Sequence, residues 1–173
     1  MIDEDLLQDD SVFRVGTVSA VEGRRVRVSV DKLKNGSHLL YKGDIVRNVA
    51  VGSYVKIVKG FFEMIAKVDG EHVREDRGAA SSDYRTAMDP VARSLDVSLV
   101  GFLHNRTFER GVRELPLLYN ECFILTAAEF ASVHQFVSPG VPMLPIGVLA
   151  TEPTQTVEVG VDDIFASHIV VLW

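Results

Sequence analysis

The densest group of residues able to hold a phosphate lies in the first fifth of the chain. Arg24, Arg25 and Arg27 stand close together, and Lys32 and Lys34 follow them. Guanidinium and ammonium groups bind nucleic-acid phosphates, so a DNA contact is conceivable here. No aromatic residue that could stack on a base is interleaved with these side chains. We therefore favour a solvated strand face and turn over a nucleic-acid site.

The histidines and the cysteine do not form a pattern typical of a metal site. The five histidines are His38, His72, His104, His134 and His168. No pair of them has the spacing of metal ligands, so we predict no metal-binding residue. Cys122 is the only cysteine and cannot form an intrachain disulfide. It lies within the apolar run ECFIL, which favours a buried small hydrophobic residue over a nucleophile.

Carboxylates and phosphate loops give no catalytic arrangement either. Neighbouring acids occur at Asp9-Asp10 and Asp162-Asp163. Adjacent residues on a strand point to opposite faces, and acids at a helix start favour the helix dipole, so helix capping explains Asp162 better than catalysis does. In FERGV, residues 108–112, a Glu-Arg pair before glycine predicts a salt bridge or a subunit contact. No GxxxxGK[ST] motif occurs, so we predict no catalytic and no cofactor-binding residue in this chain.

Composition and charge are those of a globular protein without a general attraction for nucleic acid. Basic residues number 18 and acidic residues 24, which leaves a formal net charge of -6. Such a chain needs a local basic patch to contact a phosphate backbone. The acidic start MIDEDLLQDD lacks the features of a signal peptide, and no apolar run approaches the ~20 residues that span a bilayer. We expect a cytoplasmic protein with no membrane partner.

Alternation of apolar and polar residues predicts that these side chains are carried mainly by strands. Residues 26–30, VRVSV, have the period of a half-buried strand, and a turn at Gly23 predicts a hairpin with residues 13–21. A second hairpin is predicted within residues 54–68, with its turn at Gly60. Short strands separated by glycine turns favour a small antiparallel barrel over βαβ units.

The alternation stops over residues 69–97, which are charged and rich in small residues, with Pro90 as a breaker. A structureless loop of this length is uncommon in a compact domain. We therefore predict a long insert that is docked on the rest of the protein, with a possible short helix around residues 84–88.

The second half of the chain returns to strands and adds short helices. Thr126 is predicted to cap a helix over residues 127–136, and Asp162 to cap a helical turn that leads into the apolar segment 168–173. Further strands are predicted at residues 98–112, 121–125, 145–150 and 154–160, the last two as the final pair of the barrel.

Four segments, taken in order, resemble the N-terminal region of HerA-type ATPases of the FtsK/HerA superfamily. They are FRVGTVSAVEGRRVRVSV, VGSYVKIV, FERGVRELPLLYNECFIL and IGVLATEPTQTVEVGVDDIFASHIVVLW. The last is the closest, because family members carry the pattern IG.L...P...V.V..D..FS.H.A.L immediately before Walker A. The resemblance covers most of the chain, but not residues 69–97. In that family the region is called the HAS barrel, for its similarity to the N-terminal barrel of F-type ATP synthase subunits.

The resemblance implies a mainly β fold with a defined division. Residues 1–160 are expected to form a HAS-type antiparallel β-barrel with the insert 69–97 and a short helix. Residues 161–173 are expected to begin a RecA-like core, with HIVVLW, residues 168–173, as an inner strand of its sheet and Walker A directly after it. Without covering strands the chain is expected to self-associate, in our preferred hypothesis through polar barrel contacts at residues 108–112 and 69–97.

The resemblance also implies a function for the whole protein, an ATP-dependent DNA translocase or helicase that is a hexamer through its ATPase core. ATP and Mg²⁺ are expected in that core, and double-stranded DNA in the ring. The barrel is expected to assemble the ring and to dock a nuclease or a sirtuin-like NADase, in anti-phage defence or DNA end processing. No catalytic residue of the family can be carried onto this chain, so the chain alone is not expected to hydrolyse ATP.

Two alternatives remain open at the level of sequence. One is a stand-alone barrel that binds single-stranded nucleic acid, which would need exposed aromatic side chains such as Tyr41, Tyr54, Phe61 and Phe62. The other is the barrel domain of a rotary ATP synthase subunit.

Overall fold

The computed structural model describes residues 13–32, 38–41, 44–47, 49–75, 91–135, 137, 140–150 and 155–165. Its contacts divide the chain into two compact units, Met1–Thr126 and Ala127–Trp173. The structure is mainly β, as the sequence predicts. No helix in the described part of the chain has the length and apolar character needed to cross a membrane.

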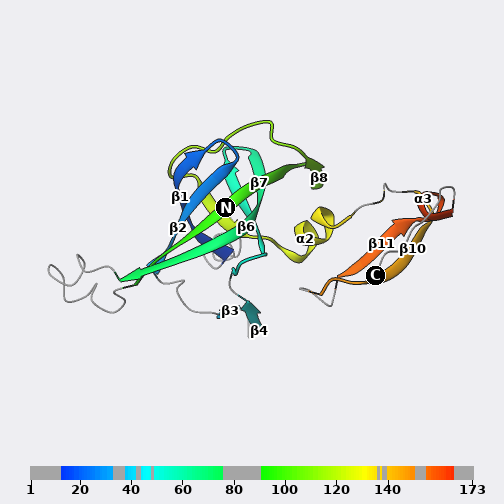
Figure 1. The fold of residues 1–173 in the computed structure, drawn as a ribbon, viewed down its shortest axis with the longest axis horizontal. Coiled ribbons are helices and arrows are strands. Elements are labelled where there is room, and N and C mark those ends of the chain that lie inside the picture. Colours follow the sequence, from blue (N-terminus) through cyan, green and yellow to red (C-terminus); the bar gives the residue numbers. More distant parts are fainter. Residues whose placement is uncertain are drawn as a thin grey trace, which may run out of the picture. The chain divides into compact units, whose positions relative to one another are not determined.

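The first unit contains a closed barrel of six antiparallel strands (Figure 1). The sheet runs in the order β2-β1-β9-β5-β6-β7, and β7 pairs back onto β2 to close it. The barrel strands are β1 (Arg14–Glu22), β2 (Arg25–Val30), β5 (Tyr54–Lys59), β6 (Phe62–Glu75), β7 (Val91–His104) and β9 (Glu121–Ile124). A further strand, β8 (Thr107–Arg110), pairs with β7 outside the closed ring. The predicted small antiparallel barrel is therefore confirmed.

The barrel begins with the two hairpins that the alternation predicts. Val26, Val28 and Val30 of β2 are buried, while the residues between them are exposed. β2 pairs with β1 across a turn at Gly23, whose φ of 60° suits a residue without a side chain. β5 pairs with β6 in the same way across Gly60. Both predicted hairpins are confirmed.

The barrel interior is filled by aliphatic side chains from all six strands. The members of this core are Val15, Val18, Val26, Val28, Val30, Val49, Val55, Ile57, Met64, Ala66, Val68, Leu95, Val97, Leu99 and Cys122. At Gly16 the neighbouring strand β2 leaves no room for a side chain, because a Cβ there would lie 1.9 Å from the carbonyl oxygen of Ser29. The core thus fixes which residues of each strand face outwards.

The predicted insert over residues 69–97 is wrong at both ends. β6 continues to Glu75 and β7 starts at Val91, and their pairing runs from Gly70 opposite Asp96 to Glu75 opposite Val91. The charged residues of this stretch gave no strand pattern in the sequence. In the structure, ion pairs between these residues help to hold the two strands together. Arg93 is almost fully buried, and its Nε donates to Glu71 at 2.6 Å. The possible helix at residues 84–88 lies outside the described residues.

A separate two-stranded sheet in the first unit was not predicted from the sequence. It consists of β3 (His38–Tyr41) and β4 (Asp44–Arg47), paired antiparallel.

The second unit holds α2 (Ala127–Val133), β10 (Met143–Val148), β11 (Thr156–Gly160) and α3 (Val161–Phe165). The helix after Thr126 and the hairpin β10–β11 are confirmed. Their assignment to the barrel is wrong, because β10 and β11 form a sheet of their own. The period of a strand shows that the strand exists but not which sheet it joins, and β10 and β11 pair only with each other among the described strands.

The division of the chain also differs from the expected boundary between residues 160 and 161, since the compact units meet at Thr126 and Ala127. α3 starts at Val161, so Asp162 lies within its first turn and not at the capping position before it. Its carboxylate is still close to the positive end of the helix dipole. The predicted terminal strand, residues 168–173, lies outside the described residues.

Candidate functional site

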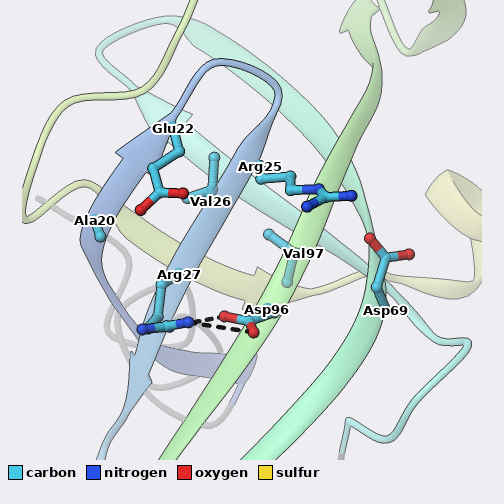
Figure 2. Close-up of a pocket in the computed structure, with 8 residues that line it drawn as sticks. All are labelled: Ala20, Glu22, Arg25, Val26, Arg27, Asp69, Asp96 and Val97. Carbon is cyan, nitrogen blue, oxygen red and sulfur yellow. Dashed lines mark hydrogen bonds and ion pairs between the residues drawn. The ribbon is translucent and has the colours of Figure 1, made fainter.

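The outer face of the barrel has a hollow of about 390 Å³ over four of its strands (Figure 2). It is lined by Ala20 and Glu22 of β1, Arg25, Val26 and Arg27 of β2, Asp69 of β6, and Asp96 and Val97 of β7. The alternation of β2 explains the position of its arginines, because Val26 points into the core and its two neighbours must point outwards. Figure 2 shows Arg25 extending from β2 over β7, towards the side on which Asp69 lies.

A two-point ion pair joins the strands that close the barrel. Arg27 and Asp96 are directly opposite each other in the β2–β7 pairing. The Nε of Arg27 donates to Oδ1 of Asp96 at 2.7 Å, and its Nη2 donates to Oδ2 at 3.3 Å. This hydrogen bonding holds the pKa of Asp96 below its usual value and raises the pKa of Arg27. Both groups therefore stay charged at neutral pH.

Further polar contacts spread from this pair over the same face. Nε2 of His72 lies 2.7 Å from Oδ2 of Asp96, and this contact also helps to lower the pKa of Asp96. The hydroxyl of Ser98 donates to the carboxylate of Asp69. Arg24, at the turn before β2, donates from Nη2 to the carbonyl oxygen of Leu99 at 3.2 Å. The polar side chains of this face thus hold neighbouring strands together.

The structure describes four residues of the basic cluster, Arg24, Arg25, Arg27 and Lys32. Arg24, Arg25 and Arg27 are exposed at the turn and on the strand face, as we favoured. Arg24 and Arg27 already bind acceptors of the barrel itself. They would have to give up these contacts to bind an external phosphate. Lys32 follows the end of β2, and Lys34 lies outside the described residues.

The residues that line the hollow carry charges of both signs. They supply three carboxylates and two guanidinium groups, without a hydroxyl, thiol, amine or imidazole. Within the part of the chain that the structure describes, no group of three or more His, Cys, Asp or Glu side chains is placed to hold a metal ion. Opposite charges on neighbouring strands suit mutual stabilisation of the strands.

The histidines whose side chains are described have different neighbours. His72 contacts Asp96, and Nε2 of His104 lies 3.3 Å from the side-chain Nδ2 of Asn105. In the second unit, Nδ1 of His134 lies 2.9 Å from the carbonyl oxygen of Phe130 one helical turn earlier. The side chain of His38, and His168 as a whole, lie outside the described part of the chain.

Cys122 is buried in the barrel core on β9, with 0% of its surface exposed. Burial raises the pKa of its thiol to about 12. The thiol is therefore protonated at neutral pH and lacks the nucleophilic thiolate form. The prediction of a buried small hydrophobic residue is confirmed.

The Glu-Arg motif at residues 108–112 lies on β8 and the turn after it. Glu109 does form a salt bridge, but the one recorded for it is to Arg113, whose Nη2 donates to Oε2 at 3.0 Å. The guanidinium of Arg113 also lies 4.4 Å from the centre of the Phe102 ring. The predicted salt bridge of this motif is confirmed, but the partner of Glu109 is Arg113, which lies just after the motif.

The aromatic residues considered for base stacking do not form a row among the described side chains. Phe62 is half-buried and stacks on Phe102, with ring centres 5.4 Å apart. Tyr54 is also half-buried, and Phe61 is fully exposed at the β5–β6 turn. The side chain of Tyr41 lies outside the described set.

Sequence reasoning missed one surface, the exposed apolar loop LPLLY between β8 and β9. Its consecutive leucines follow neither a strand nor a helix period, so the alternation gives no hint of which residues are exposed. No family model matches this chain, and no curated protein matches it.

Proposed function

We propose that this chain is the N-terminal assembly and partner-docking domain of a HerA-type ATP-dependent DNA translocase. One observation carries the proposal, the closed barrel of six antiparallel strands in the first unit. Three of the four segments on which the resemblance rests supply much of it, and the fourth contains β11 and α3 of the second unit. FRVGTVSAVEGRRVRVSV contains the β1–β2 hairpin, VGSYVKIV contains most of β5, and FERGVRELPLLYNECFIL contains most of β8 and all of β9. A barrel at this position is what the resemblance implies.

The charges of the barrel support a role in protein contact and not in DNA binding. The chain has a net charge of -6, and two of its clustered arginines are bound to acceptors of the barrel. Six such chains in one ring would carry about -36 formal charges, which disfavours duplex DNA on their surface. In the proposed motor the ATPase core binds ATP, Mg²⁺ and DNA, and the barrels hold a nuclease or a sirtuin-like NADase.

The most direct test is the reading frame that encodes the chain. The proposal predicts a GxxxxGK[ST] motif within about ten residues after Trp173, because the phosphate loop follows the first core strand. The product of such a frame should form hexamers and hydrolyse ATP faster in the presence of duplex DNA. A stop codon directly after Trp173 would contradict the motor.

The chain itself allows a second test by calorimetry with ATP, duplex DNA and single-stranded DNA. We expect no heat of binding with any of them at micromolar concentration, since the chain lacks the amides and lysine of a phosphate loop. Binding of ATP would contradict the proposal. Binding of single-stranded DNA that weakens with salt would favour the single-strand-binding barrel instead.

A further inference from the structure

The loop between β8 and β9 exposes large apolar side chains. It crosses from β8 to β9 as a long arc (Figure 1). Leu117 is 59% exposed, Leu118 54% and Tyr119 80%, whereas Pro116 between Leu115 and Leu117 is buried. The hydrophobic effect favours burial of large apolar side chains, but here they are exposed. Exposed apolar patches of this kind often mark a contact surface.

Hydrogen bonds fix the loop in this conformation. The amide of Tyr119 donates to the carbonyl oxygen of Val18 at 2.9 Å, and the amide of Val18 donates to that of Asn120 at 2.9 Å. The side chain of Asn120 accepts from the amide of Leu117 at 2.7 Å. Tyr119 has a φ of 68°, a left-handed conformation that is unfavourable for a bulky residue. An asparagine would adopt it more easily, so the ring of Tyr119 is held outwards at a conformational cost.

The end of β5 contacts the start of this loop, and the β5–β6 turn that follows exposes a further aromatic ring. Nζ of Lys59 donates to Oε2 of Glu114 at 2.9 Å and to the carbonyl oxygen of Leu115 at 3.3 Å. Phe61, two residues after Lys59, is fully exposed. We call the exposed set the apolar rim, and it consists of Phe61, Leu115, Leu117, Leu118 and Tyr119.

The charged groups bordering the apolar rim have partners within the same chain. Lys59 is paired with Glu114, and Arg113 with Glu109 at 3.0 Å. Two copies of an acidic chain repel each other in general. At this border the local charges cancel, so a second copy can approach without bringing unpaired charges together.

We propose that the apolar rim is a contact surface for a second copy of this chain, rim against rim. In a twofold contact the same surface of each copy faces the other. An apolar surface suits this arrangement, because each side chain then buries apolar area on both partners. The exposed fractions of these five side chains correspond to roughly 600 Å² per copy, the upper end of the range for the largest patch of a typical monomer. A pair would bury roughly 1,200 Å², the lower limit for specific interfaces, so the association is weak and depends on concentration. This inference does not rest on the proposed function.

Sedimentation equilibrium of the chain over a range of concentrations tests the inference. We expect dimers in the micromolar range. For Tyr119→Asn we expect a dissociation constant at least about tenfold higher. A tyrosine at the centre of an interface is a typical hot spot, and this change removes one from each of the two copies. Asparagine suits the left-handed φ of this position, so the variant should fold. Leu118→Ser should weaken the dimer to a similar or smaller degree.

Val51→Ser is the matched control. Val51 is 60% exposed and precedes β5, whereas Lys59 ends that strand, so the control removes apolar surface at the other end of β5. It should leave the dissociation constant unchanged.

Three results would overturn the inference. They are a monomer at every concentration up to the millimolar range, a Tyr119→Asn variant that associates like the parent chain, and equal weakening by Val51→Ser. In the first of these cases, binding of phosphatidylcholine vesicles through Tyr119 would show that the apolar rim contacts a lipid surface and not a second copy. The motor proposal is tested separately by the reading frame, so failure of either can be recognised on its own.

Discussion

Two outer surfaces of the same barrel differ in the character of their side chains and in the contacts that those side chains make. The face over β1, β2, β6 and β7 is charged, and its groups bind one another, as Arg27 binds Asp96 and Asp96 contacts His72. The apolar rim between β8 and β9 carries Leu118 and Tyr119, which are more than half exposed. The charged groups of the first surface have partners within the chain, whereas the apolar side chains of the second are exposed to solvent.

The difference indicates where free energy is available for binding. A partner that covered the charged face would have to compete with existing ion pairs and to remove water from them, so little net gain is expected there. A partner that covered the apolar rim would remove apolar surface from water, and the loop is already ordered by hydrogen bonds of Tyr119 and Asn120. Apolar exposure, more than charge, therefore marks the candidate interface.

The largest expected effect comes from breaking the barrel that carries both surfaces. In Gly16→Ala the new Cβ would lie 1.9 Å from the carbonyl oxygen of Ser29, so β1 and β2 must move apart. We expect a loss of about 3 kcal/mol in the free energy of unfolding, since the clash is with backbone. Urea denaturation followed by circular dichroism measures it.

Gly23→Ala is the control for this change. A Cβ at Gly23 meets nothing within 4 Å, but its φ of 60° disfavours a side chain. We expect a loss of only about 1 kcal/mol from that backbone preference. Equal losses in the two variants would show that close strand approach at Gly16 does not matter.

The next effect uses Cys122 to test whether the barrel stays closed when the rim is altered. The thiol is buried and its pKa is raised to about 12, so the native chain should react with a thiol reagent at pH 8 at least about a hundredfold more slowly than the chain in urea. Tyr119→Asn should keep this protection, and Gly16→Ala should lose much of it. Rapid labelling of the native parent chain would contradict the burial of Cys122.

The hairpins and the closed barrel could be predicted because their information is local. Val26, Val28 and Val30 alternate, and a glycine at each turn permits the positive φ that the reversal requires. Residues 69–75 and 91–97 could not be recognised in this way. Their pairing depends on partners far away in the sequence, such as Glu71 with Arg93.

The candidate surfaces were predictable to different degrees for the same reason. Exposure of Arg25 and Arg27 follows from the period of one strand, but the Asp96 that neutralises Arg27 is 69 residues away. Exposure of Leu118 and Tyr119 depends on backbone hydrogen bonds to Val18, which no sequence period records. The strand pair 145–150 and 154–160 was placed in the barrel because a period shows that a strand exists, but not which sheet it joins.

A smaller effect separates the strain in the apolar rim from its role in association. Tyr119→Asn places a residue that tolerates positive φ at the strained position. We expect the free energy of unfolding of the monomer to rise by roughly 0.5–1 kcal/mol. Urea denaturation at a concentration far below that of dimer formation measures this. If the variant is less stable than the parent chain, the tyrosine ring is packed and not presented.

The smallest effect is expected at the charged face. Asp96→Asn removes the carboxylate bound by Arg27, but both side chains are more than a third exposed, so water and salt screen the pair. We expect only a small fall in the thermal midpoint, which should shrink further in high salt. Glu158→Gln, on the exposed part of β11, should have no comparable effect.

The pH dependence of that difference identifies its cause. The pKa of Asp96 is lowered in the folded chain from the ordinary value of 3.8, chiefly by the hydrogen bond from Arg27. The folded state therefore holds the proton of Asp96 less tightly than the unfolded state does, and stability rises with pH between the two pKa values. The contribution of Asp96 should be complete well above pH 3.8 and should disappear as the pH falls below it, through the lowered pKa. Urea denaturation of the parent chain and Asp96→Asn at several pH values from 3 to 7 measures this difference. A difference that stays constant down to the lowest pH would show that the aspartate acts by shape and not by charge, and the charged face would then be no more electrostatic than the apolar rim.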